Sequence, residues 1–140
     1  GMSVQSHGRT HRFLADLDAG ELEAELHDSR RVLESLAGRT VDALALPGGR
    51  GAARELAAAR AAGYRHLLGS RPGVNRGRRD GWLERIAVTR GMPLARFRQL
   101  LCWRGAAPRI AQWRYEALQW PKRVLGNRAY ERVRSLVVRT

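Results

Sequence analysis

The sequence predicts an α/β protein in which parallel strands alternate with helices, followed by a helical extension. Three observations carry this prediction: a long amphipathic segment with helix start and stop signals, short apolar runs typical of buried strands, and a late series of helical patterns. Strands that alternate with helices pair in parallel through right-handed crossovers. We expect an α/β domain over residues 1–92 and a helical extension, packed on it, over residues 93–140.

The helix expected over residues 19–37 has the clearest signals. Asp18 and Glu21 have the spacing of a capping box, and Gly38 is a natural C-terminal cap. The apolar face repeats at helical spacing and consists of Leu22, Leu26, Leu33 and Leu36. This element should therefore pack one face on the sheet.

The remaining elements are shorter. The expected strands are residues 2–5, 41–46, 64–69 and 84–88. An Ala-rich helix is expected over residues 52–62, with Gly63 ending it. The extension should contain three helices, which begin near Pro93, Pro108 and Asn127.

Composition bounds the function. The chain has 140 residues, 44% of them hydrophobic, which suggests one domain with its own core. Cys102 is the single cysteine, so neither an internal disulfide nor a Cys-rich zinc site is expected. No apolar run approaches the ~20 residues of a membrane span, and the N-terminus lacks the pattern of a signal peptide, which makes a cytoplasmic location the default expectation.

The net charge of +13 comes almost wholly from arginine. A basic surface suggests nucleic acid or another acidic polymer as a partner, with Arg71 to Arg79 as the contact region. The alternative is a coding bias, which we favour because the arginines spread along the whole chain. A non-enzymatic basic binding module is therefore the second hypothesis, and nucleic acid is not the expected partner.

His7 and His11 form the most informative pair of polar residues. Two imidazoles four residues apart can face one metal ion. The pair alone is weak support, because two polar histidines in a loop are equally compatible with the pattern. How strongly this pair indicates a metal site depends on the residues around it.

Those residues resemble a known family. Residues 6–14, SHGRTHRFL, look like the second motif of the polysaccharide deacetylases, the NodB-homology carbohydrate esterases. Residues 45–50, ALPGGR, look like the third motif, and the similarity extends over roughly residues 1 to 90. The resemblance implies a partial (β/α) barrel related to metal-dependent hydrolases that remove N- or O-acetyl groups from carbohydrates.

The resemblance also implies roles for individual residues. His7 and His11 would bind zinc or another divalent metal, and the backbone N–H of Gly48 would stabilise an oxyanion. Carbohydrate would lie against a second group of residues: Pro47, Gly49, Arg50 and Trp82. Trp82 is equally well explained as a lid on the core, and the turn at Gly48 as an ordinary strand-to-helix connection.

Departures from the family pattern leave catalysis open. The family's first motif supplies two aspartates, a metal ligand and the general base, and it lies before the second motif; we expect the catalytic set here to be incomplete. Ala45 stands where the third motif usually has an arginine, and Arg12 stands for a proline. No histidine follows His66 to act as the late general acid.

A homodimer is expected on physical grounds. A partial barrel leaves an open sheet edge and an uncovered apolar face, and such surfaces pair with other chains. The contact should include Val4 and residues 41–46.

Overall fold

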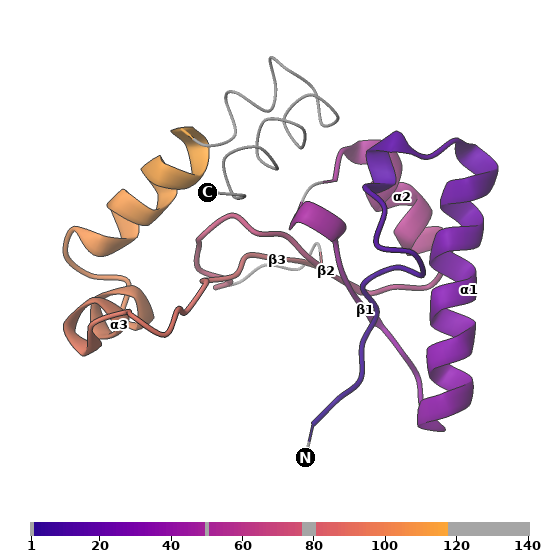
Figure 1. Ribbon diagram of the computed structural model, residues 1–140, viewed down its shortest axis with the longest axis horizontal. Coiled ribbons are helices and arrows are strands. Elements are labelled where there is room, and N and C mark those ends of the chain that lie inside the picture. The colour runs from indigo at the N-terminus through magenta and orange to yellow at the C-terminus, as the bar shows by residue number, and fades with distance from the viewer. Residues whose placement is uncertain (1, 50, 77–80, 118–140) are drawn as a thin grey trace, which may run out of the picture. The chain divides into compact units, whose positions relative to one another are not determined.

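The computed structural model describes residues 2–49, 51–76 and 81–117. They divide into two compact units, one ending at Ala87 and one beginning at Val88. The first unit contains the sheet with helices α1 and α2, and the second contains helix α3 (Figure 1). The packing of the extension on the α/β part stays a prediction.

Helix α1 (Ala19–Ala37) has the predicted bounds and the predicted capping box. The Glu21 N–H donates to Asp18 Oδ1 at 2.8 Å, and the Asp18 N–H donates to Glu21 Oε2 at 3.2 Å. Gly38 ends the helix in the left-handed conformation, with φ 62°. The predicted apolar face is wrong at Leu36, whose side chain is 80% exposed, because the core contacts of α1 end at Leu33.

The sheet contains three parallel strands in the order β1-β2-β3: β1 (Ala43–Ala45), β2 (His66–Leu68) and β3 (Trp82–Leu83). Helix α2 (Ala53–Ala61) connects β1 to β2. Parallel pairing between alternating strands and helices is therefore confirmed. The strand expected over residues 2–5 is reduced to a single parallel bridge between Ser6 and Leu44.

The third strand lies earlier than predicted. The sequence favoured residues 84–88, whereas Trp82 and Leu83 pair with Leu67 and Leu68. The last backbone bond between the paired strands is from the Gly69 N–H to the Leu83 carbonyl at 2.9 Å. Asn75, in the preceding loop, binds both backbone groups of the next residue, Glu84. Its Oδ1 accepts from the Glu84 N–H at 2.8 Å, and its Nδ2 donates to the Glu84 carbonyl at 2.9 Å.

Both helices of the first unit lie on the same side of the sheet (Figure 1). Strand residues alternate between the two faces, so Leu44 and Leu46 point to the same side and are fully buried there. They pack with Leu67 and with apolar side chains of both helices, including Leu22, Leu26 and Ala59. This core holds in place the two segments that carry the candidate site, which are the loop after Ser6 and the turn after β1.

The second unit is helical in its described part. Helix α3 (Leu94–Leu101) follows Pro93, and residues 107–117 form another helix with Pro108 in its first turn. In α3, Leu100 is buried, whereas Leu94 and Leu101 are largely exposed. The helix expected from Asn127 lies outside the described residues.

Within residues 2–49, 51–76 and 81–117, no helix has the length and apolar character needed to cross a bilayer.

Candidate functional site

The two predicted motifs meet at the carboxyl edge of the sheet. His7 follows the bridge between Ser6 and Leu44, and the turn η2 (Pro47–Gly49) follows β1. Two backbone bonds join the segments, from the Ser6 N–H to the Ala43 carbonyl at 3.1 Å and from the Ala45 N–H to the Ser6 carbonyl at 2.9 Å. Because carboxyl ends of parallel strands share one edge, residues far apart in the sequence become neighbours here.

The histidine pair is brought together as the spacing predicted. The ring centroids of His7 and His11 lie 4.8 Å apart, with an interplanar angle of 63°. His7 Nδ1 donates to the Ala45 carbonyl at 2.6 Å, so Nδ1 carries a proton, and in the neutral ring the lone pair is on Nε2. A backbone carbonyl that holds the second ring nitrogen is typical of metal-binding histidines. The two imidazoles therefore lie side by side, and the ring of one of them is oriented by the backbone.

The loop between the histidines is held by a residue that sequence reasoning missed. Glu25 of α1 is only 5% exposed, and it accepts hydrogen bonds from the backbone N–H groups of Arg9 and Thr10 at 2.7 and 2.6 Å. Its other oxygen accepts from the Thr10 hydroxyl at 2.9 Å. A charged residue beside Leu22 and Leu26 on a core-facing helix surface was the available signal.

A buried hydroxyl chain supports the same loop. Ser6 Oγ accepts from the Gly8 N–H at 3.1 Å and lies 3.0 Å from Ser29 Oγ. Ser29 Oγ is in turn 2.9 Å from the Tyr64 hydroxyl, which donates to the Leu26 carbonyl at 3.1 Å. Buried polar groups stabilise only when they are paired, as these are. The start of the histidine loop is thus tied to the core.

The turn that contains Gly48 has glycine-dependent geometry. Gly48 has φ 65° and Gly49 has φ 69°, both in the left-handed region. A Cβ on Gly48 would clash with the ring of Phe13, and a Cβ on Gly49 would clash with the side chain of Ser70. The Gly49 N–H is used within the turn, donating to the Leu46 carbonyl at 2.7 Å.

Among the residues that the structure describes, none accepts a hydrogen bond from the Gly48 N–H. Gly48 itself is exposed, whereas its neighbours Pro47 and Gly49 are buried. The Gly48 N–H is therefore a candidate donor to a ligand.

The other two residues assigned to carbohydrate contact differ from each other. Arg50 lies outside the described residues. Trp82 is half-buried and packs against the core, and its indole covers Gly69, where a Cβ would clash with the ring. This packing makes Trp82 a lid on the core, and a contact between its remaining exposed part and carbohydrate stays a prediction.

The described residues supply no third metal ligand. No group of three or more His, Cys, Asp or Glu side chains in that part of the chain is placed to hold a metal ion. The Asp18 side chain caps α1, and Asp80 lies outside the described residues. The site fits a divalent metal at two positions, short of the three protein ligands usual for catalytic zinc.

Arg12, which stands where the family usually has proline, forms an ion pair. Its Nη1 donates to Glu21 Oε1 at 2.9 Å. This hydrogen bond, together with the one from the Asp18 N–H, lowers the pKa of Glu21, and the same pairing raises the pKa of Arg12. The pair fastens the end of the histidine loop to the first turn of α1.

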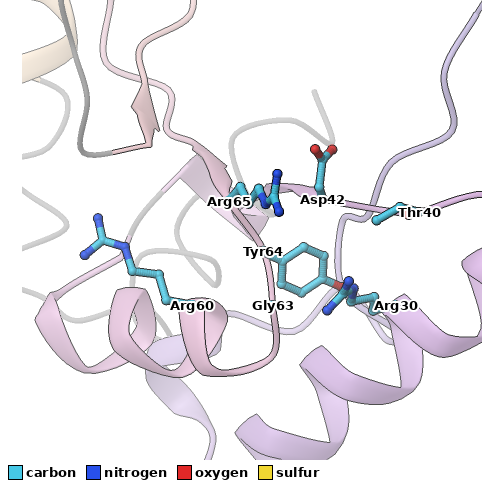
Figure 2. Close-up of a pocket in the computed structure, with 7 residues that line it drawn as sticks. All are labelled: Arg30, Thr40, Asp42, Arg60, Gly63, Tyr64 and Arg65. Atoms are coloured by element: carbon cyan, nitrogen blue, oxygen red, sulfur yellow. The ribbon is translucent and has the colours of Figure 1, made fainter.

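A cavity of about 520 Å³ lies at the opposite, amino edge of the sheet (Figure 2). Its wall is formed by Arg30, Thr40, Asp42, Arg60, Gly63, Tyr64 and Arg65. Arg30 is committed to the fold, since its guanidinium donates to the carbonyls of Val41 at 3.0 Å and Ala62 at 2.7 Å. Ligand sites of parallel sheets form at the carboxyl ends of the strands, so the histidine loop, and not this cavity, is the candidate site.

An α/β unit with a histidine pair at the carboxyl edge of a parallel sheet defines a class of candidate metal-binding proteins. Comparison with known proteins narrows the class. Residues 1–67 match the family model described as polysaccharide deacetylase. No curated protein sequence matches the chain closely enough to add to this.

Solved structures agree with the family model. A polysaccharide deacetylase from Bacillus cereus is 25% identical, with a TM-score of 0.63, over 71% of this chain and 32% of that one. The deacetylase PplD from Streptococcus pyogenes, in complex with acetate, is also 25% identical, with a TM-score of 0.66, over 71% of this chain and 45% of that one. The chain thus spans less than half the length of either structure.

Residues 1–67 thus match part of the polysaccharide deacetylase family model, and the open parallel sheet corresponds to part of the (β/α) barrel of the similar structures. The comparisons give no support to the alternative of a basic binding module.

Proposed function

We propose that this chain forms part of a metal-dependent deacetylase acting on carbohydrate, in which His7 and His11 hold zinc or another divalent metal. The observation that carries the proposal is the contact between His7 Nδ1 and the Ala45 carbonyl. It fixes the tautomer in which Nε2 can bind a cation, and His11 lies beside it.

The other residues have supporting roles. When bound, the metal would polarise the acyl carbonyl and lower the pKa of a water molecule. The Gly48 N–H would donate to the oxygen that gains negative charge. Pro47 and Gly49 would shape the wall of the groove through their backbone, and Arg50 and Trp82 would contact the sugar.

Two imidazoles alone should bind zinc weakly. Isothermal titration calorimetry with zinc should detect binding to the wild-type chain and none to the His7→Ala/His11→Ala variant. The matched control is His27→Ala/His66→Ala, which removes the two remaining histidines, both exposed and placed on α1 and β2. Equal binding by the wild type and His7→Ala/His11→Ala, or loss of binding in the control alone, would contradict the proposal.

We also propose that the chain forms a homodimer through its open sheet edge. Beyond β1 the sheet continues only through the bridge at Ser6 in the described residues, and Val4 beside it is 48% exposed. Unpaired edges associate with other strands, and a two-fold contact is the commonest solution. The net charge of +13 opposes association, so the dimer should persist in high salt, which screens that repulsion.

Light scattering over a range of protein and salt concentrations tests the dimer. A monomer mass under all conditions would reject it.

A further inference from the structure

We propose that Glu25 is the positioning residue that holds His7 and His11 ready for a metal, an inference that rests on the proposed function of the pair. Glu25 belongs to α1 and contacts neither imidazole. It acts on the loop between them. The proposal thus concerns a residue that neither of the family motifs in this sequence contains.

The first argument is the free energy that is needed to bury the Glu25 carboxylate. Glu25 lies on the core-facing side of α1, next to the fully buried Leu26, and is only 5% exposed. A carboxylate is expensive to bury unless hydrogen bonds compensate for lost water. Those bonds come from the histidine loop alone among the described residues, so the carboxylate and the loop conformation require each other.

The second argument is the place of the three bonds. They come from the N–H of Arg9, the N–H of Thr10 and the hydroxyl of Thr10. Both residues lie between the two histidines, within three positions of each. Hydrogen bonds to a charged acceptor are shorter and stronger than neutral ones, so this carboxylate fixes the separation of the imidazoles.

The third argument is steric. Gly8 has φ 81°, and a Cβ there would lie 2.8 Å from Glu25 Oε1. The absence of a side chain at position 8 is what allows the carboxylate to approach the backbone so closely. A site whose ligands lie on a loop needs such outer contacts to keep the ligands in place before metal arrives.

The test uses two readouts on the full chain. Glu25→Ala should bind zinc about 10- to 100-fold more weakly than the wild type, the usual cost of losing an outer contact of a metal site. The nuclear Overhauser effect between the rings of His7 and His11, measured without metal, should disappear. Asp28→Ala is the matched control, because it removes from the same helix an exposed ion pair with Arg9, at 2.8 Å, and should change neither readout.

Two further variants guard against loss of folding. Glu25→Gln keeps an acceptor oxygen for the two backbone N–H groups and should retain most of the ring contact. Thr10→Val removes only the hydroxyl bond and should weaken zinc binding by a few fold. A folded variant at position 25 that keeps wild-type zinc affinity and an unchanged ring contact would overturn the proposal.

The two proposals fail in different ways. If the wild type shows the ring contact but no zinc binding, the metal function fails while the positioning role stands, provided that Glu25→Ala abolishes the contact. If the ring contact persists in folded Glu25→Ala, the positioning role fails whatever the zinc affinity.

Discussion

The two edges of the sheet differ in how they are built. At the carboxyl edge, exposed imidazoles stand on a loop whose backbone is bonded to Glu25 and Ser6 and whose His7 ring is bonded to Ala45. At the amino edge, a cavity of about 520 Å³ is lined by several arginines, one of them tied into the fold (Figure 2). The cavity and the ordered histidine loop therefore lie at opposite ends of the same strands.

The difference between the two edges shows that, on a partial barrel, the contacts that orient side chains identify a candidate site better than a cavity does. A hollow between packed elements can arise wherever long side chains meet without a partner layer. A histidine with a fixed tautomer requires a specific acceptor, which here is the last residue of β1.

The largest expected effect is on catalysis. The proposed ligands at the carboxyl edge are His7 and His11, and no group of three or more His, Cys, Asp or Glu side chains in the described residues is placed to complete a metal site. Ala45 stands in place of the family's arginine, and no histidine follows His66 to act as general acid. A general base and a general acid are each typically worth ~10²–10⁴ in rate, so we expect little or no acetate release from chitin oligomers by this 140-residue chain. Robust, metal-dependent acetate release by the purified chain would contradict this prediction.

The next effect is on the stability of the carboxyl edge. Gly49→Ala places a Cβ against Ser70, whose backbone nitrogen would be 2.9 Å away, at a residue with φ 69°. Left-handed strain and overpacking together should lower the free energy of unfolding by about 2–5 kcal/mol.

The control for that substitution is Gly38→Ala. Its φ is similar, 62°, but no atom lies within 4 Å of the added Cβ, so the loss should be only about 1–2 kcal/mol. Urea denaturation measures both. Equal losses would show that the turn after β1 is no more tightly packed than an exposed helix end.

A third prediction concerns the amino edge. Arg30→Ala removes charged hydrogen bonds to Val41 and Ala62 and should lower the free energy of unfolding by about 1–3 kcal/mol. Arg65→Ala, at an exposed position of the same cavity wall, should change it by less than about 0.5 kcal/mol. Neither variant should alter zinc affinity; a change in zinc binding would mean that the cavity belongs to the site.

The smallest effect is a pH dependence at Glu21. Its pKa is lowered chiefly by the hydrogen bond from Arg12, so its charge stabilises the folded state above its ordinary pKa of 4.5. That contribution is lost as the pH falls through the lowered pKa of the folded state. Thermal unfolding of the wild type and Glu21→Gln should differ at neutral pH and converge in acid. A difference that stays constant down to pH 2 would contradict the assignment.

Sequence reasoning succeeded where local signals decide the structure. The capping box at Asp18 and the stop at Gly38 located α1, because both act within a few residues. The spacing of His7 and His11 predicted their proximity for the same reason. The third strand was misplaced because its register depends on Leu67 and Leu68 of β2, which are distant from it in the sequence.

The site shows the same limit. Glu25 and Ser29 interrupt the apolar face of α1, and apolar periodicity treats such residues as solvent-facing. Their hydrogen-bond partners lie in the segment around Ser6 and Thr10. These partners can be identified only once the packing of that segment against α1 is known.

The bonding of the histidine loop has a consequence for hydrogen exchange. Three successive amides, at Gly8, Arg9 and Thr10, donate to oxygens of Ser6 and Glu25, two side chains that are almost fully buried. Irregular loops normally exchange their amide protons with solvent through small local openings. Here those openings would expose the hydroxyl and carboxylate of the interior as well. These three protons should therefore exchange as slowly as those of the strands, and lose that protection together.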